Sequence, residues 1–339
     1  MIITLKPNIN NNNELNDLKV YFENKNIKMK EIDSESNKQK MYLLVGETYT
    51  LDEQSILSLN NVLSCHRISK LYQLASRDYQ SSDTIINVNG VKIGGKKIII
   101  IAGPCSVENY DTVLAIGKVL KGEGISILRG GAYKPRTSPY FFQGLKEEGL
   151  KILSDVKEKL NIPVISEITD ICNLDKFDNI DVIQVGARNM KNYELLKSLG
   201  RQNKPVMLKR SPDATIDELL LASEYILKEG NPNVILCERG IRSFDKNTRG
   251  VLDLSSVPLL KKLTHLPVVV DPSHALGDYS LIEPMIYASI ASGCDGIMIE
   301  VHNDPSKALS DGKQSLKTEK VKDIIKKAAK IAKIMGRDI

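Results

Sequence analysis

Short apolar runs recur along the chain from about residue 95 onward, and most are separated by stretches long enough for a helix. The runs are rich in β-branched residues and apolar throughout, which is typical of strands that flanking helices bury on both faces. Amphipathic stretches at 215–229, 281–292 and 318–333 are predicted to be helices. The eight predicted strands lie at 98–103, 125–130, 163–167, 181–186, 205–210, 233–239, 267–274 and 296–302.

Eight strands in this alternating order predict an α/β fold, a closed (β/α)8 TIM barrel that occupies residues 98–339. An open doubly wound sheet is disfavoured because it normally contains fewer strands. The first strand is also not followed by a GxGxxG motif, which disfavours a dinucleotide-binding fold.

The N-terminal part of the chain has a different pattern. Residues 1–80 follow the order strand, helix, strand, strand, helix, strand, which predicts a small ferredoxin-like α+β domain. The Asn-rich run at 9–13 is expected to be a loop. Residues 81–97 are expected to form a linker and a β-hairpin that turns at Asn89 and Gly90 and covers the barrel floor.

Composition narrows the possible functions. The chain has 339 residues, of which 42% are hydrophobic and 26% charged, as in an ordinary soluble protein. A net charge of +5 with 5% aromatic residues and no Trp favours small anionic ligands over nucleic acid. No apolar run is long enough for a membrane span and the N-terminus does not resemble a signal peptide, so we expect a cytoplasmic protein. Five scattered cysteines without a CxxC motif do not indicate a disulfide framework.

Polar residues at the ends of the predicted strands indicate an anion-binding site. In TIM barrels the chemistry lies at the carboxyl ends of the strands, where these residues converge. The loop 128–139, stiffened by Gly and Pro, adds Lys134 and Arg136, although a basic loop alone is often merely solvated. Several cations around one cavity require anionic ligands, so we expect phosphates and a carboxylate. The strand-end residues are Cys105, Arg129, Glu167, Arg188, Lys209, Arg239, His274 and Glu300.

A possible metal site is formed by Cys105, His274, Glu300 and Asp311. The first, seventh and eighth strands become neighbours when the barrel closes, and a thiol, an imidazole and carboxylates suit Mn²⁺, Fe²⁺, Co²⁺ or Zn²⁺. Simpler roles are also open: Cys105 as a small buried side chain, His274 as part of a helix cap, and Asp311 as a cap of the following helix.

The order of motifs resembles the barrel of 3-deoxy-D-arabino-heptulosonate 7-phosphate synthases of the smaller bacterial subgroup. The motifs are AGPCSVE, LRGGAYKPRTSP, GARN, LKR, CERGIRSF, DPSH, EVH and LSDGKQSL, from about residue 85 to the C-terminus. The resemblance implies condensation of phosphoenolpyruvate with erythrose 4-phosphate, the first step of the shikimate pathway, with an obligatory divalent metal. It implies metal ligands Cys105, His274, Glu300 and Asp311; phosphoenolpyruvate contacts Arg129, Lys134, Arg188, Lys209 and Arg239; and erythrose 4-phosphate contacts Arg136 and Thr137.

Three other functions are weighed against this one. The sister enzyme that makes 3-deoxy-D-manno-octulosonate 8-phosphate from arabinose 5-phosphate is disfavoured by Pro135, Arg136 and Thr137. A Schiff-base aldolase would need a neutral Lys209, which the adjacent Arg210 disfavours. A barrel that only binds ligands would not need the thiol, imidazole and carboxylate set. Within the favoured reaction, Lys134 and Glu167 are the candidates for proton transfer.

The resemblance also carries expectations about regulation and assembly. In the resembling enzymes such N-terminal modules sense an aromatic amino acid, so we expect inhibition by tyrosine or phenylalanine; an oligomerisation or solubility module is the alternative. The resemblance further suggests a homotetramer. One departure concerns Asp278 and Tyr279, which stand where the family usually has basic residues. Any phosphate or subunit contact from that loop is therefore in doubt.

Overall fold

The computed structural model describes residues 1–7, 12–32, 40–67 and 71–339, which form two compact units. The first comprises 1–82 together with 263–265, and the second comprises 83–262 and 266–339. Of the run 9–13 that we expected to be a loop, residues 9–11 lie outside the described residues. Asn12 instead begins the first helix, so the expectation is wrong for 12–13.

The smaller unit has the predicted ferredoxin-like topology. Its four antiparallel strands are ordered β2-β3-β1-β4, with one helix after β1 and another after β3. Phe22 from α1 and Ile27 are fully buried in an apolar cluster with strand residues such as Leu44. The elements are β1 (Ile2–Leu5), α1 (Asn12–Glu23), β2 (Lys28–Glu31), β3 (Met41–Val45), α2 (Glu53–Leu57) and β4 (Val62–His66).

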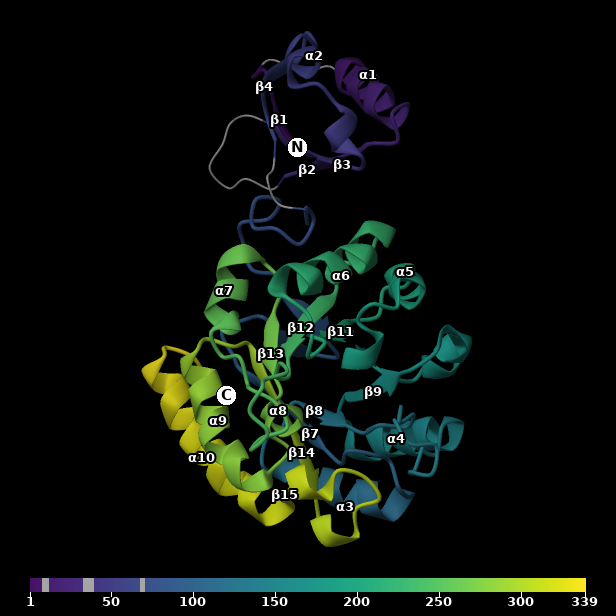
Figure 1. Ribbon diagram of the computed structural model, residues 1–339, viewed down its shortest axis with the longest axis vertical. Coiled ribbons are helices and arrows are strands. Elements are labelled where there is room, and N and C mark those ends of the chain that lie inside the picture. Colours follow the sequence, from purple (N-terminus) through teal and green to yellow (C-terminus); the bar gives the residue numbers. More distant parts are fainter. Residues whose placement is uncertain (8–11, 33–39, 68–70) are drawn as a thin grey trace. The chain divides into compact units, whose positions relative to one another are not determined.

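The larger unit is the predicted closed parallel barrel, and Figure 1 shows its helices arranged around the strands. The strands follow one another in chain order from β7 to β14, and pairing of β13 with β14 and of β14 with β7 closes the barrel. The strands are β7 (Ile99–Gly103), β8 (Ile127–Arg129), β9 (Val164–Ile168), β10 (Val182–Val185), β11 (Val206–Lys209), β12 (Val234–Glu238), β13 (Val268–Val270) and β14 (Gly296–His302), which also pairs with β15 (Leu316–Lys317).

Amphipathic helices cover the barrel where the pattern predicted them. The helix after β11, for example, begins at a capping box in which Thr215 and Glu218 satisfy each other's backbone N–H groups. No helix in the described part of the chain is long and apolar enough to cross a membrane. The helices are α3 (Tyr110–Gly122), α4 (Glu147–Leu160), α5 (Tyr193–Gly200), α6 (Ile216–Glu229), α7 (Ser256–Leu263), α8 (Pro272–Leu276), α9 (Ile282–Ala291) and α10 (Thr318–Ile334).

The strand predicted at 267–274 is shorter in the structure. It ends at Val270, and the short helix α8 starts at Pro272 with Asp271 as its N-cap. Proline suits the first position of a helix because its missing N–H would have no partner there. His274 therefore lies on a helix at the carboxyl end of the strand.

A β-hairpin packs against the inside of the barrel at the amino ends of the strands. It consists of β5 (Ile86–Val88) and β6 (Val91–Ile93), joined by Asn89 and Gly90. Both turn residues have positive φ angles, 48° and 90°, as a tight two-residue hairpin turn requires. Its buried Ile and Val side chains share one apolar cluster with Ile99, Ile127 and other residues from the strands.

Candidate active site

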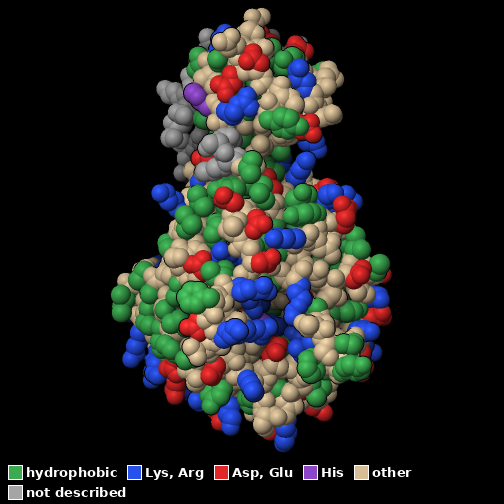
Figure 2. All heavy atoms as spheres, viewed as in Figure 1, with side chains coloured by type: hydrophobic (Ala, Val, Ile, Leu, Met, Phe, Trp, Pro, Cys, Tyr) green, Lys and Arg blue, Asp and Glu red, His purple; other side chains and the backbone are tan. Residues whose placement is uncertain are grey.

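A cavity opens at the carboxyl ends of the strands, and most predicted site residues lie on its wall. It encloses about 550 Å³, including space open to solvent. Lys and Arg side chains gather around a hollow in the larger unit (Figure 2). We call this the inner cavity; its lining residues are Lys134, Pro135, Arg136, Glu167, Gln184, Gly186, Ala187, Arg188, Lys209, Arg239, Arg249, His274 and Asp311.

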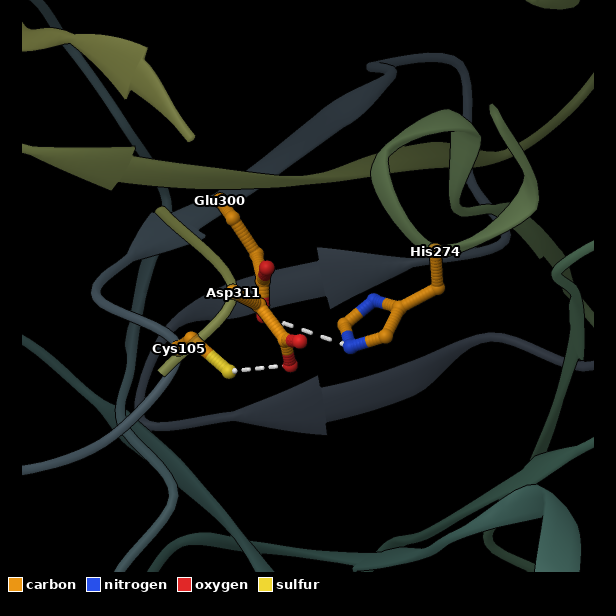
Figure 3. A group of neighbouring side chains, drawn as sticks. All are labelled: Cys105, His274, Glu300 and Asp311. Carbon is orange, nitrogen blue, oxygen red and sulfur yellow. Dashed lines mark hydrogen bonds and ion pairs between the residues drawn. The ribbon is translucent and has the colours of Figure 1, made fainter. Parts of the chain in front are cut away.

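The four predicted metal ligands lie together beside this cavity (Figure 3). One donor atom from each of Cys105, His274, Glu300 and Asp311 lies within 4.8 Å of the others. Two carboxylates, a thiol and an imidazole nitrogen at this spacing are a donor set that fits a divalent transition ion.

Glu300 is buried and held at both carboxylate oxygens. Its Oε1 accepts from Arg129 Nη1 at 2.5 Å, and its Oε2 accepts from Gln314 Nε2 at 2.6 Å. Burial opposes ionisation, but His274, Arg129 and Lys134 lower the pKa of Glu300 to about 2. The group is therefore a carboxylate at neutral pH.

His274 is oriented by Asp271. The Asp271 Oδ2 atom accepts from His274 Nδ1 at 2.7 Å, and it also accepts from Lys209 Nζ. Burial disfavours the charge on Asp271, yet His274 and Lys209 hold the pKa of Asp271 well below its usual range. An ionised Asp271 can only accept, so Nδ1 must carry the proton.

The other ring nitrogen of His274 then faces a second acceptor. Its Nε2 lies 3.2 Å from Glu300 Oε1. Burial lowers the pKa of His274, although Asp271 and Glu300 act in the opposite direction. In the neutral ring Nε2 presents a lone pair to the Glu300 carboxylate, and in the protonated ring Nε2 donates to it. The short distance therefore requires a cation between the two atoms, either a proton or a metal ion, and a metal ion would take the place of the proton.

Cys105 and Asp311 complete the cluster. The Cys105 thiol donates to Asp311 Oδ2 at 3.1 Å and accepts from Lys134 Nζ at 3.0 Å. Burial raises the pKa of Cys105 to about 12, so the free group is a thiol, and a bound metal would have to displace its proton. Asp311 has a φ of 50° and its side chain does not cap the short helix that follows. The simple cap role considered for Asp311 is therefore wrong.

Hydrogen bonds that do not involve the metal ligands join the two loops that carry Cys105 and Asp311. Ser106 Oγ and Ser310 Oγ are 2.5 Å apart, and both residues are buried. In addition, Glu108 Oε1 accepts from the backbone N–H of Leu309 at 2.8 Å. We call these contacts the loop clasp, because they hold the two loops together on one side of the cluster.

The wall of the inner cavity carries more positive than negative charge. Six of its residues are Lys or Arg and two are carboxylates. Arg188 is exposed and forms no ion pair among the described residues, and Arg239 donates to the His274 carbonyl at 2.7 Å rather than to a carboxylate. This imbalance indicates an anionic ligand.

Glu167 reaches the cavity because Gly186 leaves room for it. A Cβ at position 186 would lie 1.8 Å from Glu167 Oε1. The other carboxylate oxygen accepts from Gln184 Nε2 at 3.2 Å. Glu167 is therefore fixed close to the cations of the wall.

Two predicted substrate contacts lie away from the wall of the inner cavity. Arg129 is buried, is not among the residues that line this cavity, and pairs with Glu300. Thr137 lines a second cavity of about 720 Å³, here called the outer cavity, which shares Lys134, Pro135 and Arg136 with the inner one.

Sequence reasoning missed three residues that organise the site: Asp271, Gln314 and Arg249. Arg249 lines the inner cavity and donates to Gln314 Oε1 at 2.9 Å, so it supports Glu300 through Gln314. Asp271 belongs to the DPSH motif, but its bond to Lys209 spans 62 positions and leaves no mark in the sequence. Arg210 is bound by Glu238 and Asp253 at 2.9 Å each, so it is a structural residue rather than part of the cation cluster.

Comparison with known proteins places the chain among related enzymes. Residues 78–336 match the model of the DAHP synthetase I family. A phospho-2-dehydro-3-deoxyheptonate aldolase from Thermotoga maritima is 47% identical over 294 residues, which cover 86% of this chain and 87% of the relative. A 2-dehydro-3-deoxyphosphooctonate aldolase from Geobacter sulfurreducens is 34% identical over 270 residues, or 74% of this chain and 98% of the relative.

Solved structures show the same similarity. The crystal structure of the Thermotoga maritima DAHP synthase matches with a TM-score of 0.79 and 42% identity, covering 99% of this chain and 98% of that one. A truncated form of 3-deoxy-D-arabino-heptulosonate 7-phosphate synthase from the same organism matches with a TM-score of 0.74 and 44% identity, over 79% of this chain and 98% of that one.

Proposed function

The chain belongs to the DAHP synthetase I family, and we propose on this premise that it condenses phosphoenolpyruvate with erythrose 4-phosphate and water. The products are 3-deoxy-D-arabino-heptulosonate 7-phosphate and inorganic phosphate, and the reaction is the first step of the shikimate pathway. The observation that carries the proposal is the cluster of four potential metal ligands beside a cavity lined with cations.

Phosphoenolpyruvate is proposed to occupy the inner cavity. It carries a phosphate and a carboxylate on adjacent carbons, and the excess of Lys and Arg on the wall matches these charges. Arg188, Arg239, Lys209 and Lys134 hold the two anionic groups, while the buried Arg129 acts through its contact with Glu300. Such contacts orient the enol carbon toward the second substrate and lower the entropic cost of the reaction.

A divalent ion, Mn²⁺, Fe²⁺, Co²⁺ or Zn²⁺, is proposed to be held by Cys105, His274, Glu300 and Asp311. When bound, it supplies a Lewis acid that polarises the aldehyde oxygen of erythrose 4-phosphate. Because Asp271 accepts from Nδ1, it would leave Nε2 of His274 available to an ion, and Gln314 donates to Oε2 of Glu300. His274 is thus catalytic as a ligand.

Lys134 and Glu167 are proposed to move protons. Burial disfavours the charge on Lys134, but contact with the Cys105 sulfur, which accepts from Lys134 Nζ, and the carboxylates of Glu300 and Glu167 raise the pKa of Lys134. Lys134 is therefore protonated at neutral pH. Glu167 accepts a proton from the water that adds to the enolpyruvate carbon after the carbon–carbon bond forms. Its fixed position beside Lys134 on the cavity wall supports this division of roles.

The alternative aldose is arabinose 5-phosphate, the substrate of the sister enzyme named above. This chain is 47% identical to the phospho-2-dehydro-3-deoxyheptonate aldolase but only 34% identical to the 2-dehydro-3-deoxyphosphooctonate aldolase, which favours erythrose 4-phosphate. Arg136 and Thr137 are proposed to bind the erythrose 4-phosphate. The deciding experiment measures phosphate release from phosphoenolpyruvate with each aldose in turn; faster release with arabinose 5-phosphate would reject the proposed reaction.

The smaller unit is proposed to be a regulatory domain, residues 1–80, which binds tyrosine or phenylalanine as a feedback inhibitor. The barrel is proposed to begin at residue 98 after a linker and hairpin at 81–97, and the enzyme to act in the cytoplasm as a homotetramer. The solved structure from Thermotoga maritima that covers 99% of this chain supports a shared two-unit organisation.

A further inference from the structure

Lys146 has a backbone conformation that lysine rarely adopts. Its φ of 57° and ψ of −123° lie in a region that glycine occupies readily and residues with a Cβ avoid. The residue precedes α4, yet its side chain does not cap that helix. Strained backbone of this kind is concentrated at functional sites, which points to a role for the Lys146 side chain.

The strain follows from the way the loop that carries Lys134, Arg136 and Thr137 is closed. The Lys134 N–H donates to the Gln143 carbonyl, and the Lys146 N–H donates to the Ala132 carbonyl, both at 2.9 Å. The two ends of the loop are therefore bound to each other, and the backbone at 146 is fixed by the closure. Glycine would meet this requirement with less strain, so the lysine is not there for the sake of the backbone.

Lys146 is exposed and is one of the residues that line the outer cavity. Two other cations, Lys134 and Arg136, lie on the same wall, and none of the lining residues is a carboxylate. Within the described ranges, Lys146 forms no ion pair. The Lys134 ammonium is turned to Cys105 and Arg136 lies near Asp311, so Lys146 is the cation of this wall that has no anionic partner among the described residues.

We propose that Lys146 binds the phosphate of the aldose substrate, an inference that rests on the proposed function. Arg136 lines both cavities, and its Nη1 lies 3.8 Å from Asp311 Oδ2. An aldose phosphate whose aldehyde lies at the metal cluster would pass Arg136 and extend toward the outer cavity. Its terminal phosphate then meets Arg136, Thr137 and Lys146, so Lys146 contributes to the recognition of the second substrate and not the first.

The test compares Lys146→Met, Lys146→Gly and Lys146→Arg with Lys151→Met, a control on the exposed part of α4. Phosphate release is measured with each substrate varied in turn. Lys146→Met and Lys146→Gly should raise the KM for erythrose 4-phosphate about tenfold, because a charged hydrogen bond is lost, with the KM for phosphoenolpyruvate unchanged. Lys146→Arg and the control should retain a KM close to that of the wild type.

A second readout separates binding from folding. Lys146→Gly should raise the melting temperature by roughly 2 °C or more because it relieves the strain, even though it weakens binding of the aldose. An unchanged KM for erythrose 4-phosphate in both Lys146→Met and Lys146→Gly, or an equal rise in KM for both substrates, overturns the inference.

A result that rejects the proposed reaction can be distinguished from a result that rejects the role of Lys146. A wild-type enzyme that releases no phosphate with erythrose 4-phosphate rejects the reaction itself. In that case the inference is judged by inorganic phosphate binding, measured by calorimetry, which Lys146→Met must weaken if Lys146 binds phosphate. Equal phosphate affinity in the wild type and Lys146→Met would overturn it.

Discussion

The two units of the molecule bury different kinds of side chain. Among the described residues of the smaller unit, the core is made almost wholly of apolar side chains such as Ile3, Phe22 and Leu44. The barrel buries an apolar core at the amino ends of its strands but ionised groups at the carboxyl ends, including Arg129, Lys209 and Glu300.

The difference indicates that one region of the molecule serves stability and another serves the proposed reaction. Buried charges are costly unless they are paired or bind a ligand, so their concentration in one place marks where the molecule gives up stability for function. Changes at the carboxyl end of the barrel should therefore alter turnover by large factors, whereas changes in the smaller unit should alter regulation.

Removal of the metal should have the largest effect on turnover. We expect excess chelator to abolish phosphate release from phosphoenolpyruvate and erythrose 4-phosphate, because the aldehyde loses its Lewis acid. Addition of Mn²⁺ or Co²⁺ should restore the activity. Full activity in excess chelator would show that the Cys105, His274, Glu300 and Asp311 cluster does not serve as a metal site.

Loss of one cation from the inner cavity should have the next largest effect. Arg188→Ala or Lys209→Ala should lower turnover about 100-fold or more, since a positioned charge that stabilises the reacting anion is lost. Arg201→Ala, which removes an exposed arginine paired with Glu229, is the matched control and should leave turnover unchanged. Near-normal turnover of both cavity variants would contradict the proposed phosphoenolpyruvate clamp.

Substitution of Asp271 should weaken metal binding without unfolding the barrel. Asp271→Asn keeps the shape of the side chain but removes the charge that orients His274, and losses of about 10- to 100-fold in metal affinity are typical for such partners. The dissociation constant for Co²⁺, measured by competition with a chelator, tests this. An unchanged constant would mean that Asp271 serves only Lys209 or the helix cap.

Deletion of residues 1–80 should have the smallest effect on turnover. The candidate metal cluster and both cavities lie wholly in the larger unit, so phosphate release should continue at a rate close to that of the full chain. Inhibition by tyrosine or phenylalanine should disappear, as measured in the same assay with each amino acid added. Inhibition that persists in the truncated protein would refute the regulatory role.

The sequence was sufficient to predict the fold and to predict which candidate site residues lie close together. Buried parallel strands leave apolar runs, and barrel closure brings Cys105, His274 and Glu300 to neighbouring strands, so both could be inferred from order alone. The contact between Arg129 and Glu300 could not be inferred in this way, because strand order brings residues to one end of the barrel but does not fix which side chains pair there.

Two further features depend on three-dimensional contacts rather than on the order of residues along the chain. Asp271 and Gln314 act through contacts with side chains from other strands and loops, which no local pattern encodes. The backbone at Lys146 is set by closure of its loop, and a lysine there gives no hint of a positive φ. Loop closure and pairing between distant residues are therefore the features that the sequence pattern does not predict.

The loop clasp has a consequence for the proposed metal site. Ser106, Ser310 and Glu108 join the two loops through contacts that use none of the four candidate ligands. An ion that bound to the proposed site would displace the Cys105 proton, while these contacts could stay in place. The same folded protein would then accept divalent ions of similar size, and the supply of ions in a cell would help to decide which of them is bound.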